Sequence, residues 1–130
     1  MSQNFQNGYV SIEASVDSPR ILLDSANSIF LIEGPSYPED AYEVYECVLQ
    51  WLKQYNYIFK NQLNCQFKFK VLSSASRKMI LEILLELEKS SRNNKNVRIQ
   101  WYFEKYDEDM MEAGEDFSDN IDIPFEFISI

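Results

Sequence analysis

The sequence predicts an α/β fold in which a single-layer mixed sheet of about five or six strands packs against three helices. Segments whose apolar residues alternate in steps of two are interleaved with segments whose apolar residues recur every three or four positions. Strands that alternate with helices form parallel or mixed sheets with right-handed crossovers. In addition, two apolar runs at 21–23 and 29–32 flank a polar turn segment, which indicates an antiparallel hairpin near the start.

The first half of the chain is expected to contain this hairpin and one helix. Residues 1–8 are polar and expected to be loosely ordered, and 9–16 alternate weakly as a first strand. Gly34-Pro35 should end the second hairpin strand. A helix should then begin within 36–40, because Pro38 is tolerated in a first turn. Its apolar stripe comprises Ala41, Tyr45, Val48, Leu49, Leu52 and Tyr55.

Trp51 lies partly off this stripe. It could pack at the edge of the stripe or face a partner, and packing is the favoured interpretation.

The most informative stretch is 65–90, which begins as a strand and ends as a helix. Between them lies a segment with serines at Ser73, Ser74 and Ser76, followed by Arg77 and Lys78. A serine hydroxyl can accept a hydrogen bond from the free N–H groups of a first helical turn, so capping is the simplest interpretation. The same helix start also favours a negative group, so a phosphate on one of these serines would be supported by Arg77 or Lys78.

The remaining elements alternate in the same way. A polar connector at 91–96 leads to a strand at 97–104 and an acidic helix at 106–119, in which Gly114 should weaken the middle or end the helix early. A last strand should run from Ile123 to Phe127, with Pro124 near its start.

Composition restricts the class of protein. The chain has 130 residues, which fits a single domain over 1–130. Its net charge of −9 argues against nucleic acid and against an anionic membrane surface, and favours a basic protein partner. No apolar run is long enough to span a membrane, and the first residues lack a signal region, so a cytoplasmic protein is expected. Cys47 and Cys65 should be buried, reduced thiols.

The sequence offers few groups for catalysis. It has no histidine, its three glycines are too scattered for a phosphate loop, and Ala75 stands where a Ser-x-x-Lys pair would need its serine. The acidic residues at 107–122 lack the spacing of a calcium loop. We therefore expect no enzyme activity, no metal, no cofactor and no small-molecule substrate.

Several stretches, taken in order, resemble the SiaC family of bacterial regulatory phosphoproteins. The strand 97–102, with its Trp-Tyr pair, followed by Asp-Glu-Asp-Met at 107–110 is the most specific of them. The others are Ser18-Pro19-Arg20-Ile21, Gly34-Pro35-Ser36-Tyr37-Pro38-Glu39, Trp51-Leu52 with Tyr55, Ser73–Lys78, 112–116 and Pro124-Phe125. The resemblance implies a STAS-like fold, related to anti-sigma-factor antagonists, with a phosphorylatable residue where a central strand enters a helix.

The resemblance also implies a partner-switching function. Similar members are phosphorylated by a partner kinase and dephosphorylated by a metal-dependent serine/threonine phosphatase. Their unphosphorylated form binds and activates a diguanylate cyclase, which raises cyclic di-GMP, a signal tied to biofilm regulation. By position Ser74 inherits the acceptor role, with Ser76 or Ser73 as substitutes and with Arg77 and Lys78 beside the phosphate.

Three departures from the family pattern motivate an alternative. Ala75 and Arg77 stand where the family has serine, and Pro35 where it has arginine. The alternative is a constitutive interaction or scaffold module, or an anti-sigma-factor-antagonist-like protein, that has lost the switch.

Turns and helix starts present unpaired groups, so the expected partner contacts lie there. The candidates are Tyr37, Pro38, Glu39, Asp107, Glu108 and Asp109.

Overall fold

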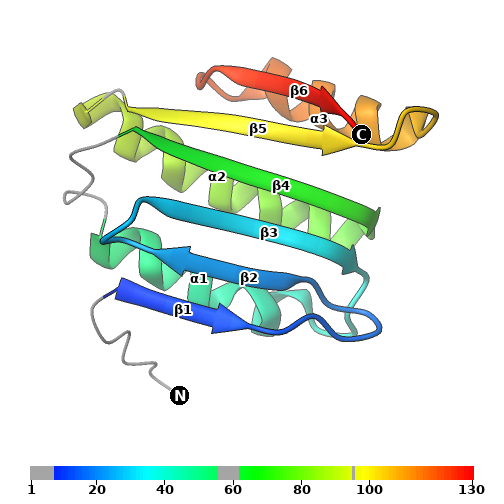
Figure 1. Cartoon of the computed structure of the whole chain (residues 1–130), viewed down its shortest axis with the longest axis horizontal. Coiled ribbons are helices and arrows are strands. Elements are labelled where there is room, and N and C mark those ends of the chain that lie inside the picture. The colour runs from blue at the N-terminus through cyan, green and yellow to red at the C-terminus, as the bar shows by residue number, and fades with distance from the viewer. Residues whose placement is uncertain (1–7, 56–61, 95) are drawn as a thin grey trace.

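A computed structural model of the chain describes residues 8–55, 62–94 and 96–130, and this part contains six strands and three helices (Figure 1). In chain order they are β1 (Tyr9–Ile12), β2 (Arg20–Asp24), β3 (Ile29–Ser36), α1 (Ala41–Tyr55), β4 (Leu63–Leu72), α2 (Ser74–Asn94), β5 (Val97–Phe103), α3 (Glu108–Asn120) and β6 (Phe125–Ser129). The predicted fold class is confirmed. Of the segment expected to be loosely ordered, residues 1–7 lie outside the described residues.

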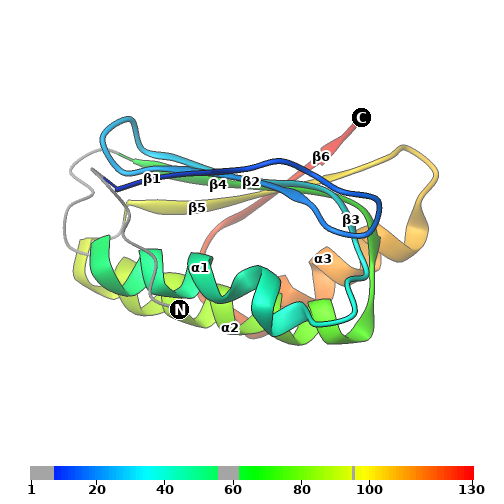
Figure 2. The same cartoon turned by 90° about the horizontal axis from the view of Figure 1, so that it is seen from below.

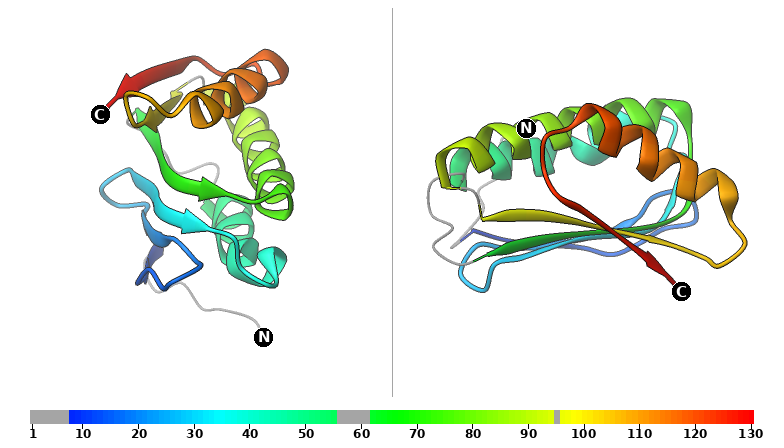
Figure 3. Two further views of the ribbon diagram at one scale, coloured as in Figure 1. Left: turned by 90° about the vertical axis from the view of Figure 1, so that its right-hand side faces the viewer. Right: turned by 90° about the horizontal axis from the view of Figure 1, so that it is seen from above.

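The strands form one mixed sheet whose spatial order follows the chain, from β1 to β6. The pairs β1–β2 and β2–β3 are antiparallel, which confirms the predicted hairpin, and the pairs β3–β4, β4–β5 and β5–β6 are parallel. Each parallel connection steps to the next strand in the same direction, so crossovers of one hand place every helix on one face. Figures 2 and 3 show α1, α2 and α3 together on that face.

Two buried tryptophans anchor the core between the sheet and the helices. Trp51 is fully buried, its ring lies 6.2 Å from that of Phe30, and its Nε1 donates to the carbonyl of Gly8 at 2.8 Å. Trp51 therefore packs inside the protein, as favoured by its position in the sequence. Trp101 on β5 is also fully buried, and its ring meets that of Phe117 on α3 edge-on at 5.5 Å.

Gly114 lies where α3 crosses the indole of Trp101. A Cβ at this position would stand 2.6 Å from Nε1 and 2.8 Å from Cγ of Trp101. Of the two effects expected of Gly114, an early end of the helix is wrong, since α3 continues to Asn120. The glycine lets the helix backbone approach the ring.

Two expected boundaries in the first half also differ. Gly34-Pro35 does not end β3, because the strand continues to Ser36 through a register shift at these residues, where Gly34 has φ +119°. The helix begins at Ala41, after Asp40, whose carboxylate accepts from the N–H of Glu43 at 3.1 Å. Pro38 therefore precedes α1 instead of occupying its first turn.

Three further boundaries were placed wrongly. The first strand ends at Ile12, well before residue 16. Helix α2 extends through most of the expected connector to Asn94. The last strand begins at Phe125, and Ile123 is buried ahead of it. Alternation of apolar residues locates elements well, but it does not mark where their hydrogen bonding stops.

In the described part of the chain, no helix combines the length and the apolar character that crossing a membrane requires.

Candidate functional site

The segments predicted to carry function gather at one end of the sheet. Ser36 and Leu72 are paired at the carboxyl ends of β3 and β4, and the N–H of Ser73 donates to the carbonyl of Ser36 at 2.9 Å. The connection from β5 to α3 starts at the same end, because β5 runs parallel to β4. The turn before α1 and the starts of α2 and α3 therefore share this edge (Figure 1).

Ser74 is the first residue of α2 and is exposed. Its hydroxyl makes no hydrogen bond to any residue in the described ranges. The cap is instead supplied by Ser73, whose Oγ accepts from the N–H of Ser76 at 3.1 Å. Ser73 thus caps the helix, and the neighbouring Ser74 has the exposed hydroxyl.

Ser76 belongs to a buried hydroxyl cluster, formed by Ser36, Tyr45, Ser73 and Ser76. Ser36 Oγ donates to Ser76 Oγ at 2.7 Å and lies 2.5 Å from the hydroxyl of Tyr45, and Ser73 Oγ donates to Ser76 Oγ at 3.1 Å. Ser76 has no exposed surface. The hydroxyl of Ser76 is therefore not accessible at the surface of the folded protein. The hydroxyl of Ser73 both donates to Ser76 Oγ and accepts from the N–H of Ser76.

Sequence reasoning missed two members of this cluster. Tyr45 was assigned to the apolar stripe of α1 and Ser36 to a helix start. Burial raises the pKa of Tyr45 far above its ordinary value, more than its hydrogen bonds to Ser36 and Ser76 lower it, so the phenol stays neutral. A hydroxyl on an apolar stripe is the one signal that could have revealed the cluster. The hydrogen bonds of the cluster connect β3, α1 and the start of α2, and Ser73 precedes Ser74 directly in the chain.

Arg77 and Lys78 lie three and four residues after Ser74, which places them on the same side of the helix as Ser74. Both are exposed and make no ion pair within the described residues. Arg77 also lines a hollow of about 330 Å³ together with Asp107 and Asp109 from the start of α3. The structure thus brings one predicted phosphate-supporting residue next to two predicted partner contacts.

Asp107 has a structural function as well, because its carboxylate caps α3 by accepting from the N–H of Met110 at 3.0 Å. Glu108 and Asp109 are exposed in the first turn of that helix.

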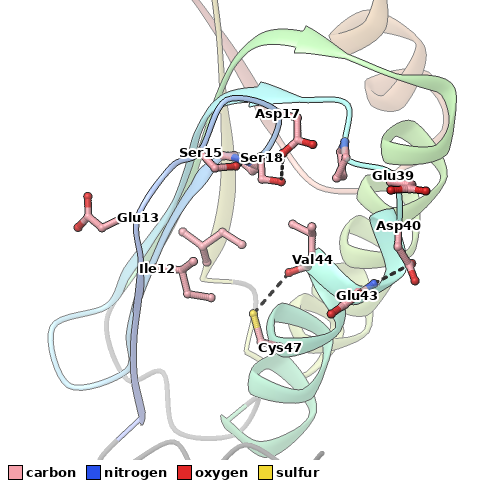
Figure 4. Close-up of a pocket in the computed structure, with 13 residues that line it drawn as sticks. Ile12, Glu13, Ser15, Asp17, Ser18, Glu39, Asp40, Glu43, Val44 and Cys47 are labelled. Carbon is pink, nitrogen blue, oxygen red and sulfur yellow. Dashed lines mark hydrogen bonds between the residues drawn. The ribbon is translucent and has the colours of Figure 1, made fainter.

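The other predicted contacts lie apart from this hollow. Tyr37 is 47% exposed and its hydroxyl donates to the carbonyl of Val16 at 3.0 Å. Pro38 and Glu39 line a larger cavity of about 800 Å³ between α1 and the segment after β1 (Figure 4). The six candidate contacts therefore fall into two groups, one beside α3 and one beside α1.

Across 8–55, 62–94 and 96–130, no three His, Cys, Asp or Glu residues are grouped so that they could hold a metal ion. The arrangement offers an exposed hydroxyl for modification by another protein.

Two buried thiols should make the stability of the protein sensitive to alkaline pH. Burial raises the pKa of the Cys47 thiol to about 11 from an ordinary value of 9.0, and it also raises the pKa of Cys65. Above pH 9 the unfolded chain releases the proton that folded Cys47 retains, so the free energy of unfolding should fall as pH rises. By pH 11 Cys47 alone should lower it by about 2 kcal/mol.

Urea unfolding of the wild type and of Cys47→Ala between pH 7.5 and 11 measures this effect. The variant should lose about 2 kcal/mol less over that range, since it lacks the thiol whose pKa burial raises to about 11. Parallel curves for the two proteins would show that Cys47 is not responsible.

Comparison with known proteins gives consistent matches. The sequence profile described as SiaC family regulatory phosphoprotein matches residues 12–130. An uncharacterized protein of Pseudomonas aeruginosa (strain UCBPP-PA14) is 25% identical over 114 residues, which cover 88% of this chain and 90% of that protein.

Solved structures share the fold. A chain in the crystal structure of the diguanylate cyclase SiaD in complex with its activator SiaC, from Pseudomonas aeruginosa, superposes with a TM-score of 0.86 at 24% identity, covering 93% of this chain and 99% of that one. A structure of SiaC from the same organism gives a TM-score of 0.85 at 23% identity, covering 94% and 98%.

Proposed function

Because the chain belongs to the SiaC family of regulatory phosphoproteins, we propose that it is a phosphorylation-gated switch whose unphosphorylated form binds and activates a diguanylate cyclase. Phosphorylation releases the cyclase. The whole of 1–130 acts as one regulatory domain without enzyme activity of its own. The observation that carries the proposal is the exposed Ser74 hydroxyl at the first turn of α2, free of hydrogen bonds to the described residues.

Ser74 is the acceptor because, of the three serines, it is the one that is exposed and whose hydroxyl forms no hydrogen bond with a described residue. Ser76 is buried in the hydroxyl cluster, and Ser73 caps the helix. A phosphate on Ser74 would meet the free N–H groups of the first turn of α2 and the cations of Arg77 and Lys78. A protein kinase adds this phosphate and a metal-dependent serine phosphatase removes it.

We place this exchange in the cytoplasm. Cys47 and Cys65 are free, buried thiols, which suits a reducing compartment. The proposed effector, a diguanylate cyclase, is the partner of the fold relative in the solved complex.

The experiment mixes the unmodified chain with each purified diguanylate cyclase of its host and measures cyclic di-GMP formation. We expect one cyclase to form a complex with the chain and to turn over faster. In parallel, the chain is isolated from its host and analysed by mass spectrometry, which should place a single phosphate on Ser74.

The two readouts separate the parts of the proposal. If no cyclase binds the chain, the effector is wrong. If a cyclase is activated but no phosphate is found under any growth condition, the chain is a constitutive module, as Ala75 and Arg77 would then explain.

A further inference from the structure

The cavity beside α1 is a groove, which we call the acidic groove (Figure 4). One wall is the end of β1 with the loop that follows it, and the other is the start of α1. Its lining includes Ile12 and Glu13 from the first wall, and Glu39, Glu43 and Val44 from the second. The two walls come from segments that residues 22–37 separate in the sequence, so the groove exists only in the folded protein.

The rim of the groove is negative throughout. Five of its lining residues are carboxylates and none is a lysine or arginine. Two of these carboxylates have structural partners: Asp17 accepts from the hydroxyls of Ser15 and Ser18, and Asp40 caps α1.

The other three carboxylates, Glu13, Glu39 and Glu43, form no hydrogen bond or ion pair through their side chains with any described residue, and all three are exposed. Their charge is therefore left uncompensated by the described part of the chain.

The floor of the groove is apolar. Ile21 and Cys47 are buried at its base, Val44 is half-buried, and Ile12 is 37% exposed on the wall formed by β1. Ile12 thus offers exposed apolar surface beside the apolar floor, which a second molecule could bury. The groove therefore combines an apolar contact at its base with negative charge along its rim.

We propose that the acidic groove binds a basic amphipathic segment of a protein partner. Apolar side chains of that segment lie on Ile12 and Val44, and its lysines or arginines face Glu13, Glu39 and Glu43. Charge complementarity selects this occupant, because opposite potentials across an interface guide association. A second copy of the chain would bring its own net charge of −9 against the groove and is disfavoured. The inference goes beyond the phosphorylation switch, since none of the lining residues is Ser74 or a member of the hydroxyl cluster.

The test uses the full chain, unphosphorylated, and a synthetic helical peptide of leucine and lysine with all lysines on one face. Binding is measured by fluorescence anisotropy at low and physiological salt, and the contact surface is mapped by NMR on ¹⁵N-labelled protein. We expect amide shifts to concentrate at 12–21 and 38–47. Affinity should fall as salt rises, because rim charges are screened. A peptide with glutamate in place of lysine should not bind.

A charge-matched pair of triple variants separates the groove from the general acidity of the protein. Glu13→Gln, Glu39→Gln and Glu43→Gln together should weaken binding about tenfold at low salt, as expected for three partly exposed ion pairs. The control is Glu82→Gln, Glu104→Gln and Glu115→Gln, which changes net charge equally at exposed sites outside the groove. The control should weaken binding less than twofold.

A third variant, Ile12→Ser, tests the apolar contact on the wall formed by β1 without changing charge, and it should also weaken binding. Equal effects of the two triple variants, or shifts spread over the whole acidic surface, would overturn the proposal. Self-association of the chain at high concentration, blocked by the peptide, would assign the groove to a second copy and would overturn it as well.

Discussion

Replacing Gly114 by alanine should lower the free energy of unfolding by about 3 kcal/mol, although alanine is the better helix former. Gly114 lies inside α3, so helix propensity alone predicts that Gly114→Ala stabilises the protein by about 1 kcal/mol. The structure predicts the opposite sign. The added Cβ would stand 2.6 Å from Nε1 and 2.8 Å from Cγ of Trp101, which is closer than real Cβ contacts come.

The ring cannot move aside at low cost. Trp101 is fully buried, and its Nε1 donates to the carbonyl of Met110 at 2.9 Å, one turn before Gly114 on the same helix. Its ring also packs at 5.5 to 5.9 Å from the rings of Phe69, Phe67 and Phe117. Relieving the clash would shift α3 or break this hydrogen bond, and overpacking of a core costs about 1–3 kcal/mol before the hydrogen bond is counted.

Chemical denaturation of Gly114→Ala and of Glu115→Ala measures the difference. Glu115 is the next residue of the same helix and is exposed, so its replacement should change stability by less than about 0.5 kcal/mol. A second variant combines Gly114→Ala with Trp101→Leu, which removes the ring that the Cβ would meet. Compared with Trp101→Leu alone, its free energy of unfolding should regain part of the helix propensity that alanine offers. A stabilised single variant would mean that α3 does not approach Trp101 as closely as described.

Gly114 also shows what sequence reasoning cannot reach. The alternation of Cys65, Phe67 and Phe69 located β4, because side chains on a strand respond to the face that is buried. For Gly114, the sequence alone indicated only its low helix propensity. The reason for a glycine at this position is the nearby ring of Trp101, and that proximity is created by the folding of α3 against β5.

The candidate site divides in the same way. The serines at the start of α2 were found from their composition, since capping is a local property of a helix start. The hydroxyl cluster and the acidic groove join β3, α1, α2 and the loop after β1, so no window of sequence contains them. The assignment of Tyr45 as an apolar residue was right for its ring and missed its hydroxyl.

Ser74→Asp should weaken binding of the proposed cyclase about 100-fold while leaving the protein at least as stable as the wild type. An aspartate at the first position of α2 places a negative charge beside free N–H groups, which should raise the free energy of unfolding by about 0.3–1 kcal/mol. A partner surface packed over residue 74 would have to desolvate this new charge, which is costly.

Affinity is measured by titration calorimetry against the cyclase, and stability by urea unfolding. The control for charge is Asn64→Asp, because Asn64 is exposed at the amino end of β4, at the opposite end of that strand from Ser74. The control for shape is Ser74→Ala, which removes only a hydroxyl that is free of hydrogen bonds to the described residues. Both controls should bind the cyclase within about threefold of the wild type, since neither places charge at the start of α2.

The opposite signs of the two effects distinguish a switch from simple damage. A substitution that disrupted the fold would lower affinity and stability together, whereas charge at Ser74 should lower affinity and raise stability. The hydroxyl cluster makes this separation possible. The side chains of Ser73 and Ser76 form the hydrogen bonds that stabilise the start of α2, and the side chain of Ser74 takes no part in them. Equal affinities of Ser74→Asp and Ser74→Ala for the cyclase would remove the switch from this residue.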